Sequence, residues 1–149
     1  MKIPFLIAAS CFIIACNHNK SSGEAAGENN SSIPKTLSDS LYKKTMEGHD
    51  VGMAKMGEIA RYQKILKQRS DSLANLKNKA GMLPALDAAL QELTSAEELM
   101  NRWMQDFDPD KAGSTEAEKV RYYAREKKKI DTVNARILSS IENAKRIAE

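Results

Sequence analysis

Sulfur and imidazole side chains recur at helical spacing in the middle of the chain, where they could bind a soft metal ion. His49, Met53 and Met56 share one face if their segment is helical, and Met100 and Met104 lie one helical turn apart in a later segment. Thioether ligands select Cu(I), and imidazole also suits copper. The spacing therefore predicts either a copper site made by these five residues or, as the alternative that we favour, methionines that fill a hydrophobic core.

Signatures of enzymes are missing from the sequence. It contains only two histidines, His18 and His49, which are too few for both a histidine-based triad and a zinc site. We find no glycine-rich phosphate loop, paired-cysteine zinc motif, metalloprotease motif or nucleophile elbow. We therefore expect no enzymatic activity and, unless copper binds, no cofactor.

Positive charge is concentrated in residues 125–129, which read Arg-Glu-Lys-Lys-Lys, in a chain whose formal net charge is +3. On a helix, most of such a run forms a solvated face. Attraction of this run to anionic lipid or polysaccharide is an alternative that the sequence leaves open. We expect no nucleic-acid partner, because the N-terminus predicts export of the chain.

The N-terminus has the pattern of a secretory signal. Lys2 supplies a positive charge, and residues 3–14 form an apolar run without charges. This run is too short to span a bilayer, which takes about 20 apolar residues. The run ends in Ile13-Ile14-Ala15-Cys16, which resembles the lipobox of bacterial lipoproteins. The sequence around Cys11 is a weaker second candidate, because its apolar run would be very short.

The resemblance implies that Cys16 carries a covalent lipid and that residues 1–15 are a lipoprotein signal peptide removed before it. The alternative is an ordinary secretory signal followed by an unmodified Cys16. Lipoprotein processing attaches two or three acyl chains, such as palmitate, whereas a single chain anchors a protein only marginally. We therefore expect a cell-envelope protein held at a membrane. Asn17, rather than aspartate, follows the cysteine, which favours the outer membrane.

The exported chain divides into a tether and one domain. Residues 16–33 are rich in Asn, Ser, Gly and Glu and have almost no apolar content, which predicts a flexible tether after the acylated cysteine. Residues 34–149 are rich in Ala, Glu, Lys, Leu and Met, a composition that favours helix. Helical periodicity predicts helices over 35–79, 84–107 and 116–148. We predict an all-α fold, an antiparallel three-helix bundle with coiled-coil-like packing.

Details of this bundle can also be predicted. Gly48, Gly52 and Gly57 weaken the first helix and predict a bend or break. The first turns of this long helix should overhang the end of the bundle or fold across it. Glu97 and Lys127 each interrupt an apolar stripe. Counting outward from the connection between the second and third helices places these two residues opposite each other, so we predict a polar pair. The alternative is that each side chain reaches solvent separately.

Two segments resemble small helical lipoproteins of the Bacteroidota that are often labelled viral A-type inclusion proteins. They are residues 49–59, HDVGMAKMGEI, and residues 100–104, MNRWM. The resemblance implies a periplasmic or surface-facing helical lipoprotein and supplies no activity. Three functions stay open: a non-enzymatic structural or interaction role, an envelope copper-binding role, and a helical module that binds a protein partner or a second copy of the chain.

Overall fold

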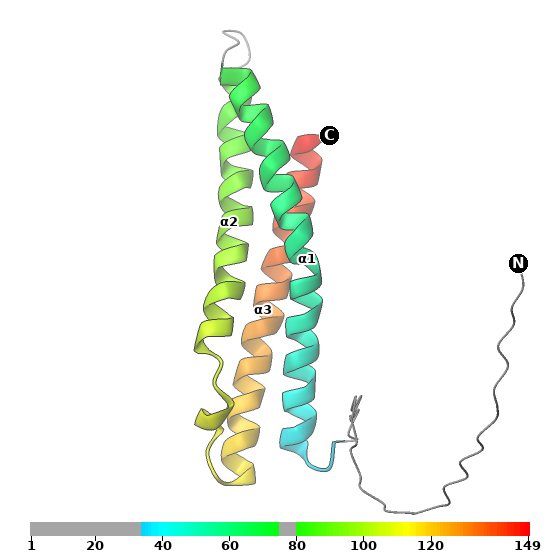
Figure 1. The fold of residues 1–149 in the computed structure, drawn as a ribbon, viewed down its shortest axis with the longest axis vertical. Helices are drawn as coiled ribbons and strands as arrows, with labels where there is room; N and C mark the ends of the chain where they lie inside the picture. Colours follow the sequence, from blue (N-terminus) through cyan, green and yellow to red (C-terminus); the bar gives the residue numbers. More distant parts are fainter. Residues whose placement is uncertain (1–33, 75–79) are drawn as a thin grey trace, which may run out of the picture. The chain divides into compact units, whose positions relative to one another are not determined.

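The computed structural model describes residues 34–74 and 80–149 of the chain. Within these residues the fold is all-helical, with α1 (Leu37–Ala74), η1 (Ala80–Met82), α2 (Leu83–Asp106), η2 (Pro109–Ala112) and α3 (Glu116–Ala148). The three long helices pack against one another, α1 and α3 running in the same direction and α2 opposite to both (Figure 1). The predicted three-helix bundle is therefore confirmed. Cys16, the predicted signal peptide and the predicted tether lie outside the described residues, as do positions 75–79 of the predicted first helix.

Local signals in the sequence set the helix ends. Thr36 precedes α1, and its hydroxyl accepts from the backbone amide of Asp39 at 3.1 Å. Thr115 precedes α3 and exchanges hydrogen bonds with Glu118 in a capping box, in which the side chain of each residue bonds the backbone amide of the other. These bonds satisfy amides that have no partner inside the helix. The start of α3 therefore lies where the sequence predicts it.

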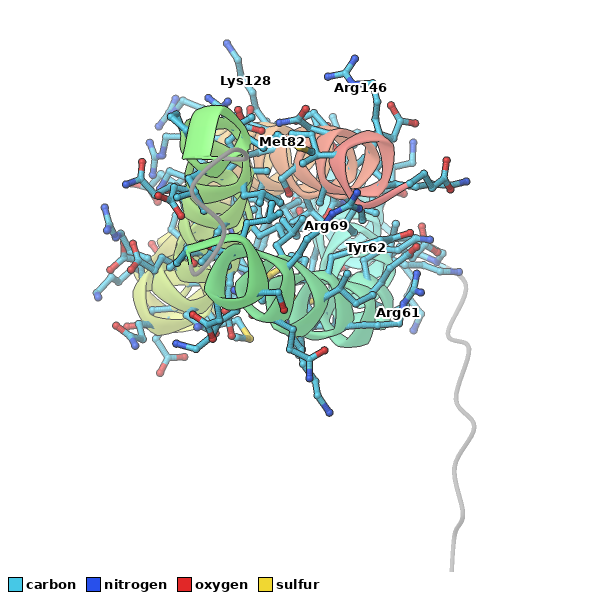
Figure 2. All side chains as sticks on the ribbon, turned by 90° about the horizontal axis from the view of Figure 1, so that it is seen from above. Arg61, Tyr62, Arg69, Met82, Lys128 and Arg146 are labelled. Carbon is cyan, nitrogen blue, oxygen red and sulfur yellow. The ribbon has the colours of Figure 1, made fainter. Side chains whose placement is uncertain are left out.

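One continuous core runs along the bundle between the three helices. Its largest fully buried side chains come from every helix: Ile59, Leu66, Leu86, Leu93, Met100, Ile130 and Ile137. Full burial of one such side chain stabilises the fold by about 1.5–3 kcal/mol. Charged residues such as Lys128 and Arg146 point outward from the helices (Figure 2). This division between apolar interior and charged exterior holds the three helices together.

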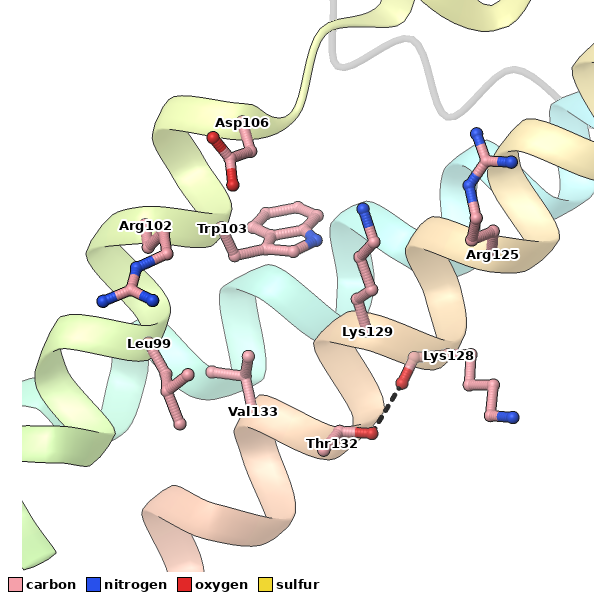
Figure 3. A pocket seen from close by; sticks show the side chains of 9 residues that line it. All are labelled: Leu99, Arg102, Trp103, Asp106, Arg125, Lys128, Lys129, Thr132 and Val133. Atoms are coloured by element: carbon pink, nitrogen blue, oxygen red, sulfur yellow. Dashed lines mark hydrogen bonds between the residues drawn. The ribbon is translucent and has the colours of Figure 1, made fainter.

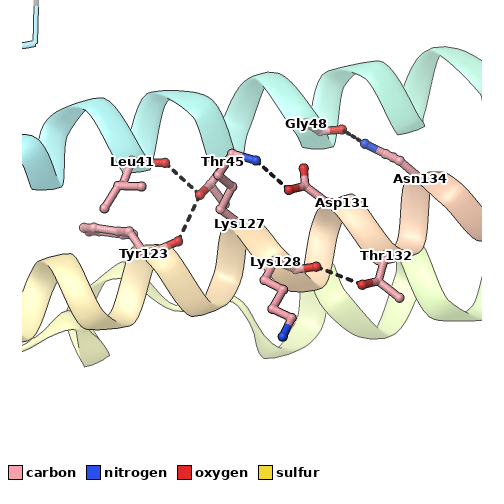
Figure 4. A network of polar contacts seen from close by, with 9 residues as sticks. All are labelled: Leu41, Thr45, Gly48, Tyr123, Lys127, Lys128, Asp131, Thr132 and Asn134. Carbon is pink, nitrogen blue, oxygen red and sulfur yellow. Dashed lines mark hydrogen bonds and ion pairs between the residues drawn. The ribbon is translucent and has the colours of Figure 1, made fainter.

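The glycines of α1 allow close packing rather than a break. Helix α1 is continuous from Leu37 to Ala74, so it does not break, but its second half leans toward α2, which is the bend that was predicted as the alternative (Figure 1). A Cβ added at Gly52 would lie 2.2 Å from Met100 Cε and 2.4 Å from Asn134 Oδ1. Asn134 Nδ2 donates to the Gly48 carbonyl oxygen at 2.8 Å (Figure 4). Two of the three glycines thus let neighbouring helices approach the α1 backbone, and the packing holds the helix intact.

The first turns of α1 and α3 lie side by side. Ser38 donates to Glu116 from its backbone amide at 3.0 Å and from its hydroxyl at 2.7 Å. The buried Thr45 hydroxyl bonds the Leu41 carbonyl at 2.8 Å and lies 3.4 Å from the carbonyl oxygen of Tyr123 (Figure 4). The first turns of α1 therefore neither overhang the end of the bundle nor fold across it, and both predicted arrangements are wrong, because α3 begins early enough to pack along α1. We call this contact, from Ser38–Glu116 to Gly52–Asn134, the α1–α3 seam.

The predicted pair of Glu97 and Lys127 is also wrong. Glu97 accepts from Gln63 of α1 at 2.9 Å, and Lys127 pairs with Asp131 one turn along its own helix. Asn143 lies opposite Glu92, bonded at 2.8 Å, where the predicted register would place Thr132. Helix α3 is thus displaced by about three turns from that register.

The connection between α2 and α3 explains this displacement. This connection is not a tight turn, because the residues after α2 continue alongside the first turns of α3. There the backbone amide of Asp108 donates to the Tyr122 hydroxyl at 3.0 Å. Gly113 then turns the chain with φ of +89°, a backbone conformation that favours glycine. Helix α2 consequently ends well before α3 begins along the bundle axis (Figure 1).

Candidate functional site

A groove lies between the last two turns of α2 and the middle of α3, and we call it the α2–α3 groove (Figure 3). It encloses about 420 Å³. It is lined by Leu99, Arg102, Trp103, Asp106, Arg125, Lys128, Lys129, Thr132 and Val133. Its volume is within the range of about 300–1,000 Å³ that small-molecule sites occupy.

Helical spacing brings these residues to the groove. Positions 99, 102, 103 and 106 recur every three or four residues and face one side of α2, and positions 125, 128, 129 and 132 do the same on α3. Leu99, Trp103 and Val133 give the groove an apolar floor, while long cationic side chains lie along its rims (Figure 3). This arrangement can cover an apolar group and place an anionic group beside it.

The rim contains more free positive than negative charge. Lys129 is bound to the buried carboxylate of Glu126, with 2.8 Å between Nζ and Oε1, and Arg125 Nε lies 3.9 Å from the same oxygen. In the described part of the chain, neither Arg102 nor Lys128 has a carboxylate within 4 Å. Asp106 is the acidic residue of the lining. Two cations without an acidic partner therefore lie on opposite helices, and their side chains extend away from each other along the outer sides of the groove (Figure 3).

The floor of the groove contains an unpaired hydrogen-bond donor. Trp103 is only 5% exposed, and its indole Nε1 has no hydrogen-bond partner among the described residues. Its nitrogen-bearing edge turns toward Lys129 (Figure 3). Glu126 Oε2 is buried without a partner as well. Leaving a buried polar group unpaired costs about 1–3 kcal/mol, so unpaired groups of this kind call for a functional explanation.

Trp103 belongs to a cluster of aromatic rings at the end of the bundle where α2 stops. Its ring stacks on Phe107 with 4.8 Å between centroids, and the His49 ring lies 5.7 Å from it on the α1 side. Further ring contacts continue from Phe107 to Tyr42, Tyr122 and Tyr123. Burial, followed by the neighbouring tyrosines, raises the pKa of Tyr123. These stacked rings fix the orientation of the indole over the groove.

Two carboxylates near the α1–α3 seam have shifted pKa values. The backbone amide and hydroxyl of Ser38 hold the pKa of Glu116 below its ordinary value of 4.5. Bonds from Thr115, and then from the Ser114 amide, lower the pKa of Glu118. Both glutamates therefore act as ionised hydrogen-bond acceptors that secure the start of α3.

The residues of the predicted copper site occupy different environments. Met100 is fully buried against Gly52, Met56 packs against the core, and Met53 and Met104 are 39% and 37% exposed. His49 Nδ1 lies 3.0 Å from Asp50 Oδ1. Core packing accounts for Met100 and Met56. Copper binding stays a prediction, which a Cu(I) titration against a competing chelator would test.

The described helices also have neither the features of a membrane span nor those of a metal cluster. None of them combines the length and the apolar character needed to cross a membrane. Among residues 34–74 and 80–149, no three His, Cys, Asp or Glu side chains are grouped so that they could hold a metal ion.

The α2–α3 groove was not predicted from the sequence, although the cationic run that forms one of its rims is visible there. Arg125, Lys128 and Lys129 are spaced so that they share one face of a helix with Val133. This spacing could have indicated a surface with cationic and apolar side chains. This face of α3 could not be placed opposite Trp103 from the sequence, because the predicted register paired α3 with the wrong part of α2. Comparison of the chain with known protein families, curated proteins and solved structures finds no match.

Proposed function

We propose that this chain is a lipoprotein of the bacterial cell envelope, anchored through Cys16, and that its helical bundle binds a ligand rather than catalysing a reaction. The observation that carries the proposal is the lipobox-like segment Ile13-Ile14-Ala15-Cys16 at the end of an apolar run. A polar stretch, residues 17–33, separates this cysteine from the bundle. A tether of this length reaches roughly 20–25 Å as a random coil, so the bundle would stay close to the lipid surface.

The bundle itself supports a binding role through the chemistry of the α2–α3 groove. Its floor is apolar, its rims are cationic, and an unpaired indole donor lies in its wall. Such a lining suits recognition, because it offers contact area, charge and one directional hydrogen bond.

Metabolic labelling tests the anchor with a matched pair of cysteine variants. The full chain is expressed in a bacterium fed with an alkyne analogue of palmitate, and the labelled chain is located by membrane fractionation. We expect the parent chain and Cys11→Ser to be labelled and to fractionate with the outer membrane. Cys16→Ser should be unlabelled and should keep its signal peptide. Labelling of Cys16→Ser, or loss of labelling in Cys11→Ser, would overturn the proposed anchor.

A further inference from the structure

We infer that the α2–α3 groove binds a lipid phosphate with a single acyl chain, its chain on the apolar floor and its phosphate at the rim beside Trp103, where Arg102 and Lys128, which extend outward in the unliganded structure, would turn inward to meet it (Figure 3). The inference deepens the proposed function, since an anchored domain would meet such molecules at the membrane surface. It rests on four features of the described residues: the floor, the length of the groove, the free rim charges and the indole donor.

The floor and its length favour an acyl chain over a folded partner. Leu99, Trp103 and Val133 form an apolar surface that would remain wet if only a small inorganic ion were bound. From Leu99 to Asp106 the groove follows seven residues of helix, or roughly 10 Å at 1.5 Å per residue. A second hollow continues along α2 and α3, but it is lined mainly by polar residues, Glu92 and Glu98 among them. A long amphipathic helix would therefore lose its apolar contacts after about two turns.

The rim charges favour a phosphate as the head group. Arg102 of α2 and Lys128 of α3 have no carboxylate partner within 4 Å in the described part of the chain. A phosphate monoester has a charge of about −1.5 to −2 at pH 7, which matches two free cations better than a single carboxylate does. The guanidinium group of Arg102 can donate two parallel hydrogen bonds to phosphate oxygens, and Lys128 adds a mobile ammonium group.

The unpaired indole of Trp103 supplies a directional contact. Its Nε1–H is buried, lacks an acceptor and turns toward Lys129 on the facing helix (Figure 3). A phosphate oxygen held at this rim would accept the hydrogen bond that the protein leaves unmade. Binding would thus remove the energetic cost of an unpaired donor, which the apolar floor alone cannot do.

Titration with decyl phosphate below its micelle concentration tests the inference on the full chain. Trp103 is the only tryptophan, so intrinsic fluorescence reports the groove directly. We expect saturable binding of one decyl phosphate per chain, with a change in the Trp103 emission. The variant with Arg102→Ala and Lys128→Ala should bind about tenfold more weakly or worse, because two charge-assisted contacts are lost.

Matched controls separate the groove from general attraction to the protein. Lys64→Ala with Lys67→Ala also removes two exposed positive charges, but from α1, and should bind like the parent chain. Trp103→Phe keeps an aromatic ring without the N–H group; calorimetry should show weaker binding while circular dichroism shows an unchanged helix content. Cys16→Ser should bind normally, so failure of the anchor and failure of the groove can be told apart.

Three results would overturn the inference. Equal affinity for decyl maltoside would show that the charge of the head group is irrelevant. Equal affinity for inorganic phosphate would show that the apolar floor is irrelevant. Binding to vesicles that contain anionic phospholipid, without binding to monomeric decyl phosphate, would assign the cations to a membrane surface instead of a lipid site.

Discussion

The α1–α3 seam and the α2–α3 groove are two contacts of the same helix, and they differ in the size of the side chains between the backbones. In the seam, Gly48 and Gly52 bring α1 close to Asn134, whose amide bonds an α1 carbonyl at 2.8 Å. In the groove, Trp103 of α2 faces long side chains of α3 such as Lys129, and about 420 Å³ stays open (Figure 3). Small residues thus close one side of α3, while large ones hold the other side open.

The difference suggests how the bundle separates stability from binding. The seam is closely packed and hydrogen-bonded through Ser38, Thr45 and the amide nitrogen of Asn134, although Asn134 Oδ1, buried against Gly52, has no hydrogen-bond partner among the described residues. The groove leaves a donor and two cations without partners, an arrangement that contributes little to folding and is useful to a ligand. Substitutions in the seam should therefore change the free energy of unfolding, and substitutions at the groove rim should change affinity.

The largest expected effect on stability comes from Gly52→Ala. The added Cβ would meet Met100 and Asn134 at 2.2 and 2.4 Å, and the shifts needed to admit it should lower the free energy of unfolding by about 1–3 kcal/mol. Gly57→Ala is the matched control, because nothing lies within 4 Å of its added Cβ; it should stabilise the helix by up to about 1 kcal/mol. Urea unfolding followed by circular dichroism measures both. Equal effects of the two substitutions would mean that the seam is not closely packed.

A smaller effect should appear as a pH dependence of the seam. Since Ser38 lowers the pKa of Glu116 in the folded chain, this contact stabilises the fold fully above the ordinary value of 4.5 and is lost as the pH falls through the folded-state pKa. Thermal unfolding of Glu116→Gln should consequently vary less with pH below 4.5 than that of the parent chain. Glu118→Gln should act in the same direction, through the capping box of α3 alone. If the stability of Glu116→Gln varied with pH as much as that of the parent chain, the Ser38–Glu116 contact would not contribute to the stability of the fold.

The smallest effect on stability is expected at the groove rim. Arg102→Ala with Lys128→Ala should alter the free energy of unfolding by no more than about 0.5 kcal/mol, as is usual for exposed substitutions. The same urea experiment measures it, beside the double variant of Lys64 and Lys67. A loss comparable to that of Gly52→Ala would show that the rim cations hold the bundle together, and the contrast between seam and groove would fail.

Much of the fold could be predicted because its signals are local. The capping box of Thr115 and Glu118 marked the start of α3, and the apolar stripes marked all three helices. The register of α2 against α3 could not be predicted in the same way, because it depends on how the connection packs. The bond between the Asp108 amide and the Tyr122 hydroxyl joins residues whose proximity no periodicity reveals. The error in that register misplaced Lys127 and hid the groove.

The seam was missed for a related reason. When only the helix itself is considered, glycines are predicted to weaken it. In the bundle, however, Gly48 and Gly52 let Asn134 of α3 approach the α1 backbone closely. Of the predicted copper ligands, Met100 occupies the space that Gly52 leaves, a tertiary contact that spacing alone cannot distinguish from a metal-facing position.

The indole N–H signal of Trp103 in a nitrogen–proton correlation spectrum tests the binding role of the groove most directly. The chain contains one tryptophan and therefore gives one such signal. We predict that decyl phosphate moves this signal saturably, and that the variant with Arg102→Ala and Lys128→Ala needs about tenfold more ligand for the same shift. An indole signal that stays in place while signals elsewhere in the bundle move would contradict the assignment of the groove as the binding site.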